Sequence, residues 1–163
     1  MKLTIALLQL TPKELDQKFN LKKGIEACRK AKELDADLAL FPEMWNIGYA
    51  FCQPNKKREW EAEAISQQSE FFEAYVRVAK ELEMNIAITY LEKFSPMPRN
   101  TVSIINSKGE VILNYSKVFL CNFGQEELHK EHYKIDDIGT DYNCSSGTTF
   151  DVCVLENKGG SVK

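Results

Sequence analysis

A run of four apolar residues, Leu38 to Phe41, constrains this chain more than any other feature of its sequence. A short run that is apolar at every position is typical of a strand buried on both faces, as the strands of parallel sheets are. A helical pattern precedes the run, and Pro42 ends it because proline has no N–H group to continue the ladder. The sequence therefore predicts an α/β fold.

Helix and strand patterns alternate through the first half of the chain, and strand follows strand in the second. The spacing of apolar residues predicts helices over 20–34, with Asn20 as the N-cap, and over 60–83. Residues 1–10 predict a buried first strand, and the alternation over 150–154 predicts a half-buried one. Further strands are predicted over 86–91, 101–105, 111–113 and 161–163, the second and third of them forming a β-hairpin.

The composition is that of a soluble globular chain, with 44% hydrophobic and 28% charged residues among 163. A formal net charge of −3, without long runs of one sign, argues against nucleic-acid and membrane partners. Five scattered cysteines indicate reduced thiols and a cytoplasmic protein. Because no repeat or linker interrupts the sequence, residues 1–163 are expected to form one domain or a part of one.

Glu43 follows the buried strand directly, in the sequence Phe41-Pro42-Glu43. The carboxyl ends of parallel strands are where α/β sheets place functional groups. A partly buried carboxylate at such a position can serve as a general base. The alternative is a surface glutamate that merely ends a strand.

Lys117 lies just past the predicted hairpin, between Tyr115 and Phe119. A fixed positive charge there can stabilise an oxyanion. The alternative is a lysine whose aliphatic stem lies along apolar surface while its ammonium group reaches water. Because 74 residues separate Lys117 from Glu43, only the fold can bring the two together.

Two further groups of residues allow more than one interpretation. Trp45 and Tyr49 follow Glu43 and would either form an apolar wall for a substrate or pack in the core. His129 and His132 have the i, i+3 spacing of one helix face, but an isolated pair favours a solvated loop over a metal site.

Several motifs together resemble the nitrilase, or carbon–nitrogen hydrolase, superfamily. They occur in the family's order: IALLQL near the start, then EACRKAKELDADLALFPEMWNIGY, RNTVSIINSKGEVILNYSKVFL and SSGTTFDV. The most specific combination is Phe-Pro-Glu after a buried strand with Tyr-x-Lys-x-x-Leu after an Asn-Thr-x-x-x-Ile hairpin. The resemblance extends over nearly the entire chain.

This resemblance implies an α-β-β-α sandwich and hydrolysis of a non-peptide C–N bond by a Glu-Lys-Cys triad, without metal or cofactor. Glu43 matches the family's general base and Lys117 its oxyanion-stabilising lysine. Many members have a second glutamate after the lysine, and Glu126 matches it best by spacing. Glu127 and Glu131 remain alternatives.

The sequence departs from the family at the nucleophile. Members carry a strand-end motif similar to C-Y-D-x-x-F-P-E, and no cysteine here matches it. Because that motif follows a short glycine turn, and the sequence ends three residues after Gly160, we expect the N-terminal part of an enzyme, incomplete at its C-terminal side. Cys28 and Cys153 are expected to be small hydrophobic residues, whereas Cys144 is the candidate for an exposed, reactive thiol.

The expected function is hydrolysis of a small amide, carbamoyl compound or nitrile, with amides favoured because they dominate the family. The 163 residues alone are expected to be inactive. The resemblance also implies a homodimer or larger homo-oligomer. The alternative is a non-catalytic α/β binding or scaffold protein that has lost its nucleophile.

Overall fold

The computed structural model describes residues 2–121, 143–157 and 160–162. Its main element is a five-stranded mixed sheet in the order β1-β2-β3-β4-β5. The strands are β1 (Ile5–Leu7), β2 (Leu38–Leu40), β3 (Asn85–Glu92), β4 (Arg99–Ile105) and β5 (Val111–Ser116). The first three are parallel to one another, whereas β4 and β5 form the predicted antiparallel hairpin.

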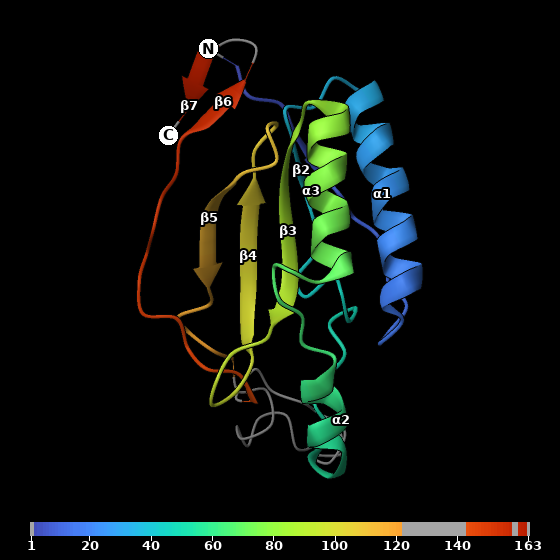
Figure 1. Ribbon diagram of the computed structural model, residues 1–163, viewed down its shortest axis with the longest axis vertical. Helices are drawn as coiled ribbons and strands as arrows, with labels where there is room; N and C mark the ends of the chain where they lie inside the picture. Colours follow the sequence, from blue (N-terminus) through green and yellow to red (C-terminus); the bar gives the residue numbers. More distant parts are fainter. Residues whose placement is uncertain (1, 122–142, 158–159, 163) are drawn as a thin grey trace, which may run out of the picture.

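The uniformly apolar strand β2 lies between two parallel partners, as its sequence predicts. Ala39 pairs with Ala6 of β1 on one side and with Ile86 of β3 on the other. Strand β1 also lies where the sequence predicts, but it is not buried. It is an edge strand of the sheet, and the side chains of Ile5 and Leu7 are exposed on the face opposite the two long helices (Figure 1).

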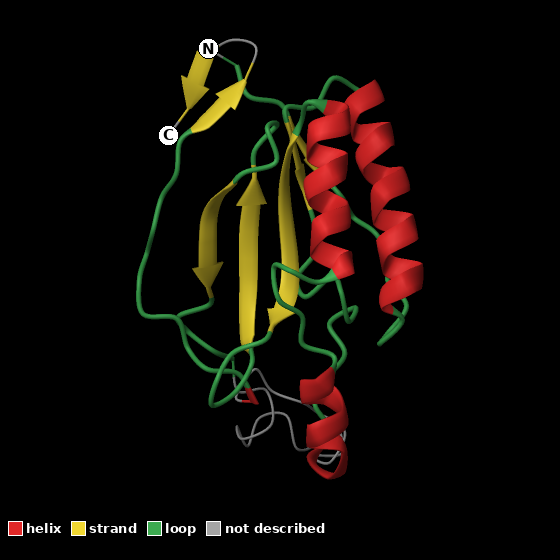
Figure 2. Ribbon diagram, in the orientation of Figure 1, coloured by secondary structure: helices red, strands yellow, loops and turns green. Residues whose placement is uncertain are grey.

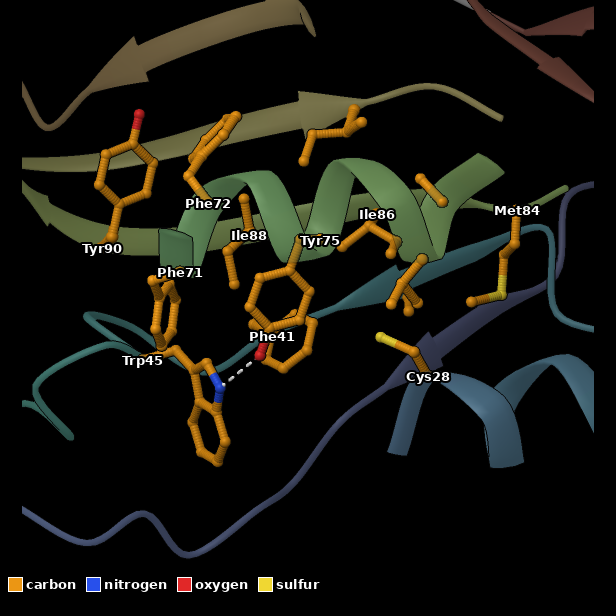
Figure 3. Packing of buried hydrophobic residues seen from close by; sticks show 14 of the residues in the cluster. Cys28, Phe41, Trp45, Phe71, Phe72, Tyr75, Met84, Ile86, Ile88 and Tyr90 are labelled. Carbon is orange, nitrogen blue, oxygen red and sulfur yellow. Dashed lines mark hydrogen bonds between the residues drawn. The ribbon is translucent and has the colours of Figure 1, made fainter. Parts of the chain in front are cut away.

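Two helices, α1 (Gln17–Glu33) and α3 (Glu70–Leu82), lie against the same face of the sheet (Figures 1 and 2). The core between the layers collects apolar side chains from both helices and from the sheet face that they cover. It includes Cys28, Phe41, Trp45, Phe72, Tyr75, Ile86, Ile88 and Tyr90 (Figure 3). These two layers are one half of the α-β-β-α sandwich expected from the sequence.

The N-cap prediction for the first helix is wrong. Asp16 caps α1, accepting a hydrogen bond from the Phe19 N–H at 3.0 Å. Asn20 lies one turn inside the helix and is fully buried, where its side chain donates to the carbonyl groups of Lys13 and Asn46. The side-chain amide of Asn20 thus forms hydrogen bonds with backbone carbonyl groups in two loops. The local sequence does not reveal this role.

The single helix predicted over 60–83 is two helices, α2 (Lys57–Ala62) and α3, preceded by a short 3₁₀ turn, η1 (Pro54–Lys56). Between them Ile65 forms a parallel bridge with Glu92 at the end of β3. Ser69 then starts α3 by accepting a hydrogen bond from the backbone N–H three residues later. The tertiary contact of Ile65 interrupts the helical pattern that the apolar spacing indicates.

The half-buried strand predicted over 150–154 is not formed. Phe150, Val152 and Val154 are exposed, and the strands that follow are β6 (Leu155–Asn157) and β7 (Gly160–Val162), a separate antiparallel pair (Figure 1). Alternation alone does not make a strand, because the apolar side needs a surface on which to pack. Among the described helices, none is both long and apolar enough to cross a bilayer.

Candidate active site

The carboxyl ends of β2 and β5 lie at the same edge of the sheet. Strand β5 is antiparallel to β4, which is antiparallel to β3, so β5 runs in the same direction as β2. Glu43 follows β2, and Lys117 is the first residue after β5. The topology therefore brings together two side chains that are 74 residues apart.

Glu43 and Lys117 are in direct contact. The Lys117 Nζ donates to Glu43 Oε1 at 2.9 Å, with the two side chains 27% and 44% exposed, respectively. Nearly half of the Glu43 side-chain surface thus remains exposed. An ion pair this exposed contributes only about 0–1 kcal/mol to stability, so its importance lies in where it places the charges.

A third residue, Asn100 near the start of β4, also contacts Glu43. Its side-chain Nδ2 donates to the same Glu43 Oε1 at 2.6 Å, and its side chain is buried. Asn100 is not among the site residues predicted from the sequence. The available signal was its place in the Asn-Thr-x-x-x-Ile motif of the hairpin.

The turn that carries Glu43 is held by side chains from β3 and from the turn itself. The Thr89 hydroxyl donates to the Pro42 carbonyl and accepts from the Trp45 N–H at 3.2 Å. One residue further on, Asn46 Oδ1 accepts from the Leu91 N–H at 2.8 Å. These bonds fix the backbone on both sides of Glu43 to the neighbouring strand.

A cavity of about 310 Å³ adjoins the Glu43–Lys117 pair. Its walls are mainly apolar, with polar groups concentrated near the pair. It is lined by Leu40, Phe41, Glu43, Thr89, Asn100, Thr101, Val102, Tyr115 and Lys117. This combination of apolar walls with a few polar groups suits a small organic substrate.

Trp45 and Tyr49 are not among the residues that line this cavity. Trp45 is 0% exposed, and its indole N–H donates to the Tyr75 hydroxyl at 3.0 Å inside the core (Figure 3). Of the two roles considered for Trp45, its surroundings support packing. Tyr49 is half-buried and stacks edge-on against Phe51, with ring centroids 5.2 Å apart.

All five cysteines lie in the described part of the chain, and none lines the cavity. Cys28 is buried in the core as predicted, and burial raises the pKa of its thiol to about 12. Burial also raises the thiol pKa of Cys52 and of Cys153, the latter outside any strand. The exposure predicted for Cys144 is wrong, because this residue is only 2% exposed and packs with Met44 and Ile47.

In the native protein we expect buried Cys144 to react slowly with a mild alkylating reagent. Half-buried Cys121 should react faster than Cys144. Reactivity needs access to the sulfur as well as a thiolate. A time course of alkylation followed by peptide mass spectrometry measures both sites, and the same reaction in denaturant should label them equally. Rapid labelling of native Cys144 would contradict its burial and restore it as a candidate nucleophile.

Some predicted residues lie outside the described part of the chain, namely Glu126, Glu127, Glu131, His129 and His132. Within the ranges that the structure describes, no group of three His, Cys, Asp or Glu residues is arranged to hold a metal ion. The second glutamate therefore remains a prediction.

Comparison with solved structures identifies amidases of the same fold. The NitN amidase of Nesterenkonia sp. AN1 superimposes with a TM-score of 0.72 at 22% identity, covering 98% of this chain and 55% of the amidase. A mutant of an amidase from the same source in complex with butyramide gives a TM-score of 0.71 at 23% identity, covering 97% of this chain and 52% of the other. Another mutant of this amidase is described as a member of the nitrilase superfamily. The nitrilase-like α/β fold expected from the sequence is therefore confirmed.

Sequence comparison gives the family itself. The glutamine-dependent NAD(+) synthetase of Thermotoga maritima is 26% identical over 123 residues, which are 76% of this chain and 20% of the synthetase. The chain thus spans a fifth of this relative and about half of the amidases. The sequence model of the carbon-nitrogen hydrolase family matches residues 4–152. Because this match extends over most of the length of the chain, the chain belongs to the carbon-nitrogen hydrolase family.

Proposed function

We propose that the whole protein hydrolyses a primary carboxamide to a carboxylic acid and ammonia. In this proposal Glu43 is the general base, Lys117 stabilises the oxyanion, and the nucleophile is a cysteine outside these 163 residues. The observation that carries the proposal is the 2.9 Å contact between Glu43 and Lys117 beside an apolar cavity. The two groups come from distant parts of the sequence, as a composite catalytic site requires.

The proposed reaction has two halves, and the Glu43 carboxylate transfers the protons in both. Glu43 takes the proton of the cysteine thiol, and the thiolate attacks the amide carbon to give a tetrahedral intermediate whose oxyanion lies beside the Lys117 ammonium. The C–N bond then breaks, and the leaving ammonia takes the proton from Glu43. In the second half Glu43 removes a proton from water, which attacks the thioester. The C–S bond then breaks to release the acid, and the departing thiolate takes the proton from Glu43.

The proposed substrate class follows from the relatives. Structures of the Nesterenkonia amidase contain acrylamide or butyramide, and one shows addition at its active-site cysteine. The Thermotoga relative depends on glutamine, whose side chain ends in the same primary amide group. A small amide is therefore favoured over a carbamoyl compound or a nitrile.

The cysteines support a nucleophile outside these 163 residues. All five are accounted for in the described residues, and the cavity beside Glu43 is lined by none of them. This same observation favours the second candidate, a binding or scaffold protein that keeps the fold without the chemistry. The two candidates differ in whether another segment supplies a thiol at this edge of the sheet.

The test is to assay the whole protein for ammonia release from butyramide, with butyronitrile and an N-carbamoyl amino acid as alternative substrates. We expect turnover of the amide and a transient acyl adduct on a single cysteine, detected by mass spectrometry. The 163-residue chain assayed alone should release no ammonia. Amide hydrolysis by this chain alone would contradict the external nucleophile, and no turnover of any substrate by the whole protein would favour the scaffold.

A further inference from the structure

We propose that Asn100 is a positioning residue that holds the general base and the lysine of this site in one fixed arrangement. The inference rests on the proposed function and extends it to a residue for which neither the sequence motifs nor the relatives give a role. Asn100 makes two contacts that converge on the site, one through its side chain and one through its backbone.

The side chain of Asn100 fixes one oxygen of Glu43. Asn100 is 6% exposed, and its Nδ2 lies 2.6 Å from Glu43 Oε1, the same oxygen that accepts from Lys117 Nζ at 2.9 Å. Among the residues that the structure describes, no donor reaches the other oxygen, Oε2. Both described donors therefore converge on one oxygen of the general base.

The backbone of Asn100 fixes the lysine. Its carbonyl oxygen accepts from the Lys117 N–H at 2.8 Å, which extends the ladder between β4 and β5 by one residue. One residue along each strand, the hydroxyl groups of Thr101 and Ser116 lie 3.0 Å apart, and Thr101 also donates to Glu92 at 2.8 Å. The neighbours of Asn100 and Lys117 thus lock the register of the two strands at this point.

The side-chain amide of Asn100 is chemically suited to holding the Glu43 carboxylate in place. The Glu43 side chain is 44% exposed and has several rotatable bonds, so the lysine alone leaves it freedom to turn about the shared oxygen. A second donor from a buried side chain removes that freedom. Because the amide is neutral, it adds no second positive charge that would attract a developing oxyanion away from Lys117.

The decisive variant is Asn100→Leu in the whole protein, which keeps the side-chain size and the backbone carbonyl but removes the N–H donor. We expect kcat for butyramide to fall by about 10- to 100-fold through misplacement of the base, with KM nearly unchanged. A loss confined to kcat distinguishes a misplaced base from weakened substrate binding.

The matched control is Asn114→Leu on the adjacent strand β5. Asn114 accepts from Gln67, Tyr90 and Ser103 and has no bond to Glu43, so this variant should keep the native kcat even if it loses stability. An unchanged kcat in Asn100→Leu would overturn the proposal. If Asn100→Leu does not fold, Asn100→Asp has the same shape, and its carboxylate in place of the donor should give an equal or larger loss of kcat.

A structural measurement separates this proposal from the proposed function. In crystals of the whole protein, the Glu43 carboxylate should occupy one orientation in the native form and several in Asn100→Leu. This result is expected whether or not the protein hydrolyses amides, so an inactive protein would reject the function alone. A single unchanged Glu43 orientation in the variant would reject the role of Asn100 alone.

Discussion

Glu43→Gln is expected to lower kcat/KM of the whole protein for butyramide by about 10²- to 10⁴-fold, the usual contribution of a general base. The glutamine side chain has the same shape, and its carbonyl oxygen can still accept from Lys117 and Asn100 as Glu43 Oε1 does. The glutamine side chain cannot take up a proton as the Glu43 carboxylate can. Steady-state ammonia release over a range of butyramide concentrations measures the loss.

The control for this variant is Glu59→Gln on the exposed side of α2, which has the same chemical change away from the cavity. It should retain native kinetics. Native activity in Glu43→Gln would remove Glu43 from the mechanism, whatever its distance to Lys117. Loss of activity together with loss of the folded state, monitored by circular dichroism, would instead mean that the glutamate is structural.

Trp45→Ala is expected to lower the free energy of unfolding by about 3–5 kcal/mol, the cost of removing a large aromatic side chain from a core. The indole is wholly buried and hydrogen-bonded to Tyr75 (Figure 3). The surroundings are closely packed, because a Cβ atom at Gly24 of α1 would lie 2.8 Å from the indole nitrogen and would clash with the Tyr75 hydroxyl. Urea unfolding measures the change.

Leu34→Ala at the end of α1 is the control, since this side chain is exposed and its removal should change stability by no more than about 0.5 kcal/mol. If Trp45 instead formed a substrate wall, Trp45→Ala would raise KM with little effect on stability. That result would contradict the packing described for the core.

The elements that the sequence predicts well are those in which local pattern and final environment agree. Strand β2 is apolar at each position and lies between two parallel neighbours, so its pattern reports its burial directly. The hairpin of β4 and β5 is joined by a short turn, and its pairing is local. The motifs around Glu43 and Lys117 also lie on the elements that the resemblance implies, at the ends of β2 and β5.

The predictions that failed depend on contacts between distant segments. Asn20 resembles an N-cap but satisfies the backbone near Lys13 and Asn46, and Cys144 resembles a loop thiol but is buried. Asn100 lies in a recognised motif, yet its importance is visible only where its amide meets Glu43. The partners of Asn20 lie 7 and 26 residues away along the chain, and that of Asn100 lies 57 residues away. Cys144 packs with Met44, which comes 100 residues earlier.

Periodicity and short motifs are local properties of a chain, so they predict the class of fold, the order of most strands and the chemical types at two strand ends. They do not predict that Glu43 meets Lys117, that Asn100 joins them, or that Trp45 packs in the core. These contacts depend on the direction and register of strands in the sheet. Pairing between β2, β3, β4 and β5 sets both, and no single segment of the sequence contains that information.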